Sequence, residues 1–141
     1  MKGKRVLALD VGNRRIGVAY SDPLGISANP LPYIENNEKV FENIKKLVEE
    51  YDIGELVVGL PLTLKGEEGE QARITKAFVE ELKKHIPDIP VEFVDERFTT
   101  SLAEQHLRET TKKSKRKKKV DSLAAVFILK TYLQQQQFRN G

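Results

Sequence analysis

The sequence predicts a single-domain α/β fold, in which a mixed sheet of about five strands is covered by helices on both faces. Three observations support this prediction: the length of 141 residues, short apolar runs that alternate with amphipathic segments, and turn-forming residues between them. A chain of this length can bury one continuous core but not two substantial ones. We therefore expect residues 1–141 to form one domain.

The first part of the chain indicates three meandering strands. Lys4–Asp10 is an apolar run that ends in an acid, and Ile16–Ser21 is a second run joined to it through a short polar loop. These two segments predict a β-hairpin. Gly25–Ile34 is interrupted by Pro30 and Pro32, so we expect a third strand at an edge of the sheet, where missing backbone donors are tolerated.

The middle of the chain indicates helices and strands in alternation. Apolar residues recur every three or four positions over Glu38–Tyr51, which is one face of an amphipathic helix. Leu56–Leu60 follows as a short buried strand, and a polar loop leads to a helix over about Glu70–His85. Val91–Val94 is a further buried strand, which stops at three charged residues. This order implies a βα unit.

The last part of the chain predicts two helices separated by a basic segment. Ser101 and Glu104 have the spacing of a capping box, which opens a short helix to about Glu109. A final helix is predicted near Val120–Gln137. The complete order of three strands, helix, strand, helix, strand, helix, helix is that of a ribonuclease H-like fold.

The composition excludes several classes of function. The sequence has no cysteine, which removes disulfides, thiolate nucleophiles and thiolate-bound zinc. Hydrophobic residues make up 39% of the chain and charged residues 32%, and no apolar run approaches the roughly 20 residues that cross a bilayer. We therefore expect a cytoplasmic protein without a membrane span.

Acidic residues end two of the predicted strands. Asp10 ends the first strand, so its carboxylate is expected at the carboxyl edge of the sheet, where open α/β sheets bind ligands. Asp95 and Glu96 end a second strand and point to opposite faces, so only one of them can join Asp10. Glu96 is preferred because its longer side chain can turn back across the sheet end. Asp95, the possible substitute, can pair with Arg97 or bond the loop, and turn formation by Asp10 is the simpler structural alternative.

Asp121 begins the last predicted helix and completes the acidic set. Ala124, Ala125 and Ile128 follow it at helical spacing, which predicts Asp121 on the buried face, with the two alanines allowing a close approach to the sheet. A helix N-cap is the alternative role. Three carboxylates without histidine, cysteine or lysine suit Mg²⁺ or Mn²⁺. Such ions can activate a water and stabilise the leaving oxygen of a phosphodiester.

Basic residues are concentrated just before Asp121. The net charge is +3, but residues 112–119 hold seven of the 24 lysines and arginines, so the remainder of the chain is mildly acidic. We expect a mobile basic loop at about 110–119 that neutralises nucleic-acid phosphates beside the active edge; a solvated loop without a partner is the alternative. Arg14, Arg15 and Arg97 are expected as secondary phosphate contacts. The basic residues of the loop are Lys112, Lys113, Lys115, Arg116, Lys117, Lys118 and Lys119.

Four blocks occur in order along the chain: LALDVGNRRIGVAYSD, VVGLP, FVDERFTT and VDSLAAVFIL. In this order and spacing, the sequence resembles the YqgF/RuvX family of ribonuclease H-like nucleases from beginning to end. The resemblance implies a bacterial cytoplasmic nuclease that processes the 5′ end of pre-16S ribosomal RNA in ribosome biogenesis. Holliday junction resolution in DNA recombination and repair is the competing assignment. The family's acidic positions would be Asp10, Glu96 and Asp121.

Several alternatives stay open at this point. Leu56–Gly59 ends in Gly-Leu-Pro, where ribonuclease H has a carboxylate on the corresponding strand, so the second acid would come from the neighbouring strand. The first block is also similar to the phosphate loop of actin-like and sugar-kinase ATPases, but those proteins close two such domains around a nucleotide. A non-catalytic RNA-binding module of ribosome assembly is a further possibility. The sequence does not distinguish RNA from branched DNA as the substrate, one metal from two, or a monomer from a weak homodimer. It does not indicate the cleavage position either.

Overall fold

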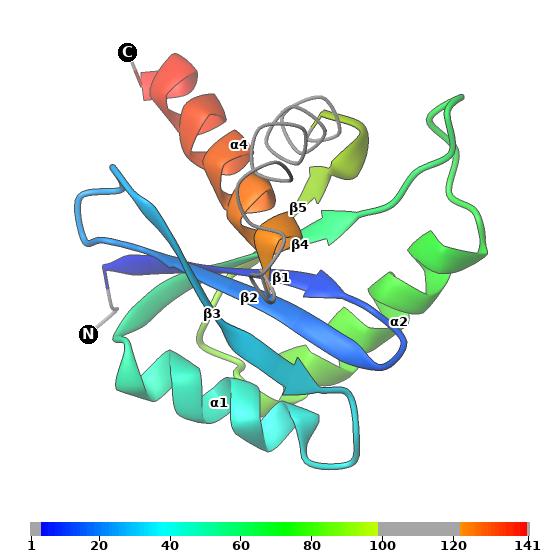
Figure 1. The fold of residues 1–141 in the computed structure, drawn as a ribbon, viewed down its shortest axis with the longest axis horizontal. Helices are drawn as coiled ribbons and strands as arrows, with labels where there is room; N and C mark the ends of the chain where they lie inside the picture. Colours follow the sequence, from blue (N-terminus) through cyan, green and yellow to red (C-terminus); the bar gives the residue numbers. More distant parts are fainter. Residues whose placement is uncertain (1–3, 99–121, 141) are drawn as a thin grey trace, which may run out of the picture.

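The computed structural model describes residues 4–98 and 122–140, and its centre is a five-stranded sheet (Figure 1). The strand order is β3-β2-β1-β4-β5, in which β1, β2 and β3 are antiparallel neighbours and β4 and β5 run parallel to β1. The predicted α/β class and mixed five-stranded sheet are therefore confirmed. The bounds are β1 (Arg5–Val11), β2 (Arg15–Ser21), β3 (Ala28–Glu35), β4 (Ile53–Leu60) and β5 (Val91–Asp95).

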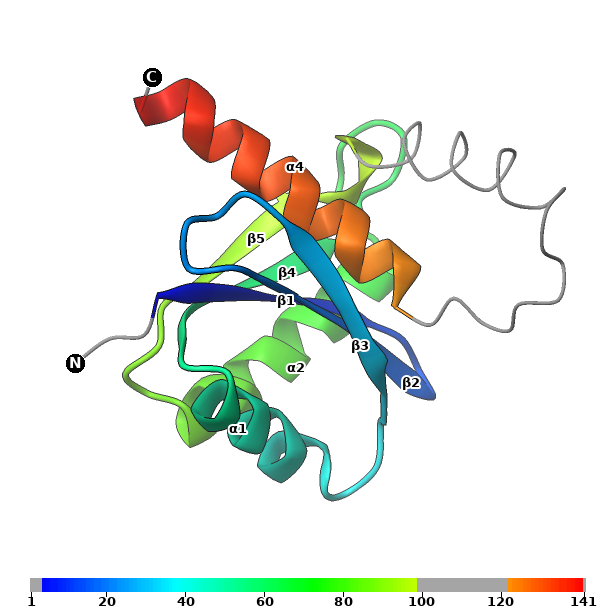
Figure 2. The same cartoon turned by 60° about the vertical axis from the view of Figure 1, so that its left-hand side comes forward.

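Helices lie on both faces of the sheet (Figure 2). The helices α1 (Val40–Glu50) and α2 (Glu70–His85) pack against one face, and α4 (Leu123–Asn140) packs against the other, which we call the α4 face. Leu7, Leu9 and Val11 of β1 join the α1/α2 layer, and Ala8 joins the α4 layer. Since side chains alternate along a strand, Asp10 lies on the α4 face.

Several element starts differ from the prediction, and β3 begins at Ala28 rather than Gly25 and α1 at Val40 rather than Glu38. The helix α4 begins at Leu123 rather than near Val120, because Ser122 has a φ of 65°, a left-handed conformation that cannot continue a right-handed helix. Ala125 is buried but Ala124 is exposed, so only one of the two alanines faces the sheet. The strand β4 begins at Ile53, directly after Asp52, whose φ of 55° reverses the chain after α1.

One further prediction is wrong: β5, expected as a buried strand, lies at an edge of the sheet, and its Glu92 and Phe93 are exposed. The helix α2 has the predicted bounds, and β3, with its two prolines, is an edge strand as predicted. The helix predicted to open at Ser101, the basic loop at about 110–119 and Asp121 lie outside the described residues. Among the helices that are described, none is long and apolar enough to cross a membrane.

Candidate functional site

Asp10 and Glu96 meet at the carboxyl ends of the parallel strands. Asp10 is the last residue but one of β1, and Glu96 opens a short 3-10 helix, η1 (Glu96–Phe98), directly after β5. Their side chains share a hydrogen bond. Because β4 lies between β1 and β5, the Glu96 side chain extends across β4 to reach Asp10.

Gly59 of β4 provides the space for this crossing. A β-carbon at position 59 would lie 2.5 Å from Oε2 of Glu96 and 2.5 Å from Cδ1 of the buried Ile128 in α4. Any side chain here would therefore displace Glu96, the helix or both. Gly59 is the glycine of Gly-Leu-Pro, at the strand end where ribonuclease H has a carboxylate. Its missing side chain leaves room for Glu96, which follows the neighbouring strand β5.

The two carboxyls do not both ionise easily in this position. Burial raises the pKa of Asp10, an effect that the hydrogen bond with Glu96 partly offsets. Burial, the nearby charge of Asp10, the shared hydrogen bond and the charge of Asp95 together raise the pKa of Glu96 to about 7. Of the two, Glu96 is the carboxyl that donates in the shared hydrogen bond, and it keeps its proton below about pH 7.

Asp95 does not join this pair. Oδ2 of Asp95 lies 2.7 Å from Nη2 of Arg97, and Oδ1 accepts the Arg97 backbone N–H at 3.0 Å. These contacts, the side-chain hydrogen bond above all, hold the pKa of Asp95 below its usual range. Nη1 of Arg97 also donates to the carbonyl of Leu64, and the guanidinium lies against Gly66. The pair therefore fastens the loop after β4 to the end of β5.

Ser122 anchors the start of α4 over β2 and β3. Its Oγ accepts the backbone N–H of Val18 at 2.8 Å and donates to the carbonyl of Leu31 at 2.6 Å. A β-carbon on Gly17 would lie 3.3 Å from the Cα of Ser122 and 3.5 Å from the Cβ of Asp10. Gly17 therefore permits a close approach between the first turn of α4 and the strand carrying Asp10.

Sequence reasoning did not identify the roles of Gly17, Gly59 and Ser122. A signal was available for the two glycines, since a glycine inside an apolar strand often marks a close approach of other atoms. No comparable signal was available for Ser122. Its bonds join backbone groups that are distant in sequence.

The predicted phosphate contacts within the described residues come from two segments, the β1–β2 loop and η1. Arg14 and Arg15 are exposed beside the carboxyl end of β1, and the Arg15 guanidinium carbon lies 5.0 Å from the ring centroid of Tyr33. Arg97 is held by Asp95 near the end of β5. The seven basic residues of the segment 112–119 lie outside the described residues.

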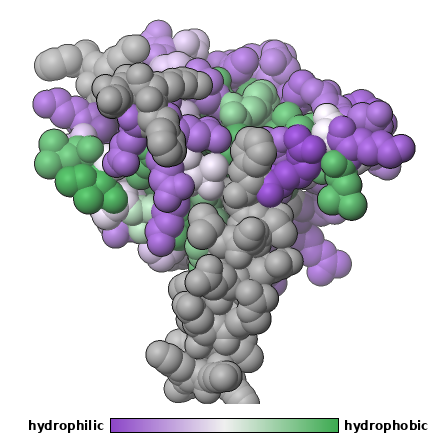
Figure 3. Space-filling model, turned by 90° about the horizontal axis from the view of Figure 1, so that it is seen from above, coloured by the Kyte–Doolittle hydropathy of each residue, from purple (hydrophilic) through white to green (hydrophobic). Residues whose placement is uncertain are grey.

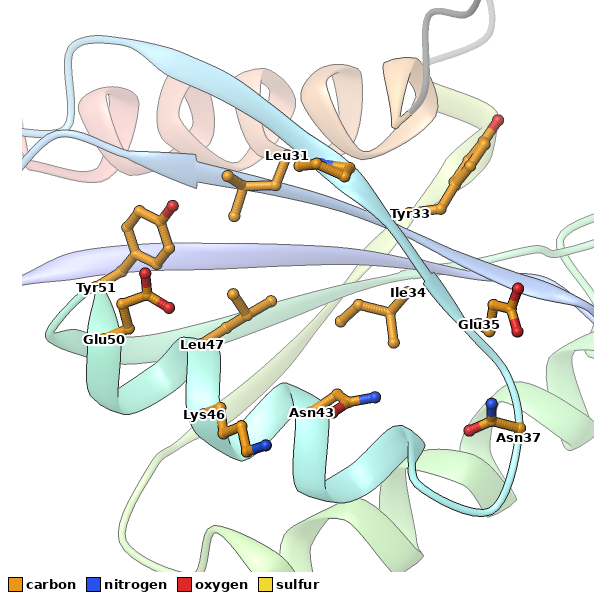
Figure 4. A pocket seen from close by; sticks show the side chains of 11 residues that line it. Leu31, Tyr33, Ile34, Glu35, Asn37, Asn43, Lys46, Leu47, Glu50 and Tyr51 are labelled. Carbon is orange, nitrogen blue, oxygen red and sulfur yellow. The ribbon is translucent and has the colours of Figure 1, made fainter.

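A hollow on the α1/α2 side of the sheet does not belong to the acidic site. This hollow, of about 510 Å³, lies between β3 and α1, lined by Leu31, Ile34, Leu47 and others (Figure 4). These side chains pack with the α1/α2 layer, whereas Asp10 and Glu96 lie on the α4 face. On that side of the molecule, hydrophilic side chains predominate and the hydrophobic groups stand apart from one another (Figure 3). The acids therefore lie on the opposite side of the sheet from this hollow.

The donor set of the described site fits a hard cation. Asp10 and Glu96 offer carboxylate oxygens, the ligands that Mg²⁺ and Mn²⁺ prefer. When both carboxyls are ionised, their negative charges repel each other, and burial strengthens this repulsion. A divalent cation bound between them would offset it. Over residues 4–98 and 122–140, histidine, cysteine, aspartate and glutamate form no group of three or more that could hold a metal. The described part of the site supplies two acids.

Known protein sequences resemble this chain over nearly its whole length. The model of the RuvX family, described as Holliday junction resolvase, matches residues 4–135. A Sulfurihydrogenibium sp. (strain YO3AOP1) protein, named "Putative pre-16S rRNA nuclease", is 64% identical, with 96% of this chain and 94% of that protein covered. A Roseiflexus sp. (strain RS-1) protein of the same name is 45% identical, with 94% and 95% covered.

Two solved structures resemble the fold. Thermus thermophilus RuvC, in complex with a Holliday junction substrate, has a TM-score of 0.63 at 10% identity, with 95% of this chain and 96% of that chain covered. The fowlpox virus Holliday junction resolvase has a TM-score of 0.57 at 9% identity, with 94% and 99% covered. The arrangement of strands and helices is therefore ribonuclease H-like, as predicted.

Proposed function

The chain belongs to the RuvX family, and from this premise we propose that it is a metal-dependent nuclease that processes the 5′ end of pre-16S ribosomal RNA in the cytoplasm. The observation that carries the proposal is the hydrogen-bonded pair of Asp10 and Glu96 at the carboxyl edge of the sheet. The names of the related proteins support the choice of substrate.

Asp10 and Glu96 would hold a divalent cation, Mg²⁺ or Mn²⁺. When bound, such an ion supplies a Lewis acid that activates water and stabilises charge on the phosphate oxygens. The protein contributes two carboxyls, one on β1 and one directly after β5, whose side chains share a hydrogen bond. Removing the proton that they share leaves two negative charges side by side, which favours cation binding.

Asp121 is proposed as the third acid of the site. It precedes Ser122, which is fixed to β2 and β3 by two hydrogen bonds and lies close to Gly17. Gly17 is the antiparallel partner of Asp10. The position of Ser122 supports a contribution from its neighbour in sequence, which makes an all-oxygen set of three carboxylates.

Nucleic-acid phosphates would be bound by basic residues around this edge. The exposed Arg14 and Arg15 of the β1–β2 loop are proposed contacts, as are the seven basic residues of the segment 112–119. Arg97 is a further candidate, although the described structure shows its guanidinium engaged by Asp95. Contacts of this kind are to the backbone and confer little sequence selectivity. A monomer or a weak homodimer would serve.

The proposal is tested by cleavage of a pre-16S ribosomal RNA fragment in Mg²⁺. The wild type is compared with Asp10→Asn, Glu96→Gln and Asp121→Asn, and with Asp88→Asn as an exposed acidic control on the loop before β5. We expect cleavage by the wild type and by Asp88→Asn only. Equal cleavage by all five proteins would indicate a contaminating nuclease, and cleavage by none would favour a non-catalytic RNA-binding module of ribosome assembly.

Holliday junction resolution is the second candidate. The description of the matching family and the likeness of the fold to RuvC favour it. A four-way DNA junction has two strands to cut at symmetric positions, so this activity would require a dimer of the chain. The same variants with a labelled junction separate the two functions, because preferential cleavage of the junction by a dimer would replace RNA processing as the main activity.

A further inference from the structure

Tyr33 is an exposed aromatic residue on the same face of the sheet as Asp10. Its exposed fraction is 39%, whereas the next residue, Ile34, packs into the α1/α2 layer. The pairing of β2 with β3 shifts register between Ile16 and Val18, so that Leu31 and Ile34 both pack in the α1/α2 layer. Tyr33, between them, lies against Arg15, which alternation along β2 places on the same face as Gly17, the partner of Asp10. Figure 4 shows its ring directed away from the hollow into which Ile34 points.

Tyr33 and Asp10 lie at the same end of the sheet. Asp10 pairs with Gly17 of β2, and the adjacent Ile16 pairs with Ile34 on the other side of β2. Two strand spacings, about 10 Å in all, therefore separate β3 from β1 at this level. The start of α4 lies close to Gly17, and the helix runs from there toward the β2–β3 turn, where Leu133 lies next to Gly25. The helix thus extends away from Tyr33.

Arg15 gives this aromatic surface a positive charge. Its guanidinium carbon lies 5.0 Å from the ring centroid of Tyr33, which is within the range of a cation–π contact. Arg14, the preceding residue, is exposed as well. A flat aromatic ring with adjacent cations is the combination by which proteins bind single-stranded nucleic acid, through stacking on bases and attraction to phosphates.

The loop that carries the two arginines is braced by the backbone. The N–H of Gly12 donates to the carbonyl of Arg15 at 3.0 Å, and the N–H of Asn36 donates to the carbonyl of Arg14 at 2.9 Å. Nδ2 of Asn36 donates to the carbonyl of Gly12 at 2.9 Å. Bonds from both sides therefore fix the loop, so little ordering of its backbone would oppose binding of a ligand.

We propose that Tyr33 stacks on an unpaired nucleobase of the substrate, while Arg14 and Arg15 contact the adjoining phosphates. The inference rests on the proposed nuclease function and adds to it a binding site for a single strand beside the acidic pair. A base inside a duplex has both faces covered by its neighbours, so Tyr33 favours a substrate that is single-stranded next to the cleaved bond.

The test is equilibrium binding without divalent cations, so that no cleavage occurs. Fluorescence anisotropy measures the affinity for a labelled single-stranded RNA, for a DNA of the same sequence, and for the corresponding duplexes. Tyr33→Leu should weaken binding of the single strands about fivefold or more, and Tyr33→Phe should retain most of the affinity. Binding of the duplexes should not change.

Phe93→Leu is the matched control. Phe93 has a similar exposed fraction, 36%, also lies on an edge strand, and has the Lys76 ammonium 6.0 Å from its ring centroid, but it faces α2 on the other side of the sheet. Its replacement should leave every affinity unchanged. An equal loss in Phe93→Leu and Tyr33→Leu would overturn the inference.

A series of oligonucleotides with one abasic nucleotide at successive positions identifies the stacked base. At one position, loss of the base should weaken binding by the wild type. With that oligonucleotide, the wild type and Tyr33→Leu should have the same affinity. A second outcome is that the wild type binds single strands while no abasic position weakens binding and Tyr33→Leu binds as tightly as the wild type. In that case the inference is wrong and the proposed nuclease function stands. If the wild type binds neither RNA nor DNA, both are wrong.

Discussion

Gly59 and Glu96 share one space: a β-carbon on Gly59 would lie 2.5 Å from Oε2 of Glu96. Glu96, directly after β5, reaches Asp10 on β1 because the strand between them has no side chain at this point. The acidic pair is therefore a property of three strands together, and its geometry can be disturbed from β4 without altering either acid.

Gly59→Ala should reduce nuclease activity while both acids remain. The added methyl group would collide with Glu96 and with the buried Ile128, so we expect the free energy of unfolding to fall by about 1–3 kcal/mol. We also expect Mn²⁺ affinity to fall. Gly69→Ala is the control, since a β-carbon there would meet Thr63 at an ordinary 3.6 Å. Unchanged Mn²⁺ affinity in Gly59→Ala would contradict the account of the crossing.

Ser122→Ala should weaken both stability and the acidic site. The substitution removes the hydroxyl that bonds Val18 and Leu31, which should cost about 1–3 kcal/mol in the free energy of unfolding. Thr131→Ala is a control of similar kind, because the buried Thr131 hydroxyl bonds Phe127 within α4. Thermal unfolding should show a loss in both variants, whereas the Mg²⁺ concentration for half-maximal cleavage should rise only in Ser122→Ala.

Without divalent cations, the protein should lose stability as pH rises from about 4.5 to about 7. The pKa of Glu96 is raised from 4.5 to about 7, so the folded state binds this proton more tightly than the unfolded state. The contribution of Glu96 to the free energy of unfolding is fully present below pH 4.5, decreases between pH 4.5 and about pH 7, and is lost above pH 7. The raised pKa of Asp10 acts in the same direction. Allowing for partial exposure, the loss should be on the order of 1–2 kcal/mol.

Glu96→Gln should remove most of this slope, because glutamine stays neutral. At pH 8 without metal, the variant should therefore unfold at a higher denaturant concentration than the wild type. Added Mg²⁺ should stabilise the wild type at pH 8 and leave Glu96→Gln unaffected. A wild type whose stability does not change between pH 5 and pH 8 would show that the two carboxyls do not interact as described.

Arg97→Gln should release the loop between β4 and α2. In the wild type, Arg97 connects Asp95 to the carbonyl of Leu64, next to Lys65. Limited proteolysis with trypsin should therefore cut after Lys65 faster in the variant, while cleavage after Lys83, on the exposed side of α2, keeps its rate. Equal rates after Lys65 would mean that the pair does not hold the loop and that Arg97 is available for phosphate.

Local sequence patterns predicted most of the fold, because each apolar run or amphipathic face had one compatible element. The bounds of α2 were predicted, and the meeting of Asp10 and Glu96 followed from two strand ends and the length of the glutamate side chain. The late start of α4 was not predicted. It depends on Ser122, whose left-handed φ is offset by bonds to strands that are distant in sequence.

Titration of Mn²⁺ into the purified protein tests the central claim, that Asp10, Glu96 and Asp121 together bind one or more divalent cations. The account predicts that the wild type and Asp88→Asn bind Mn²⁺ alike. It predicts that Asp10→Asn, Glu96→Gln and Asp121→Asn each bind it at least about tenfold more weakly. Wild-type affinity in all three variants would contradict the claim.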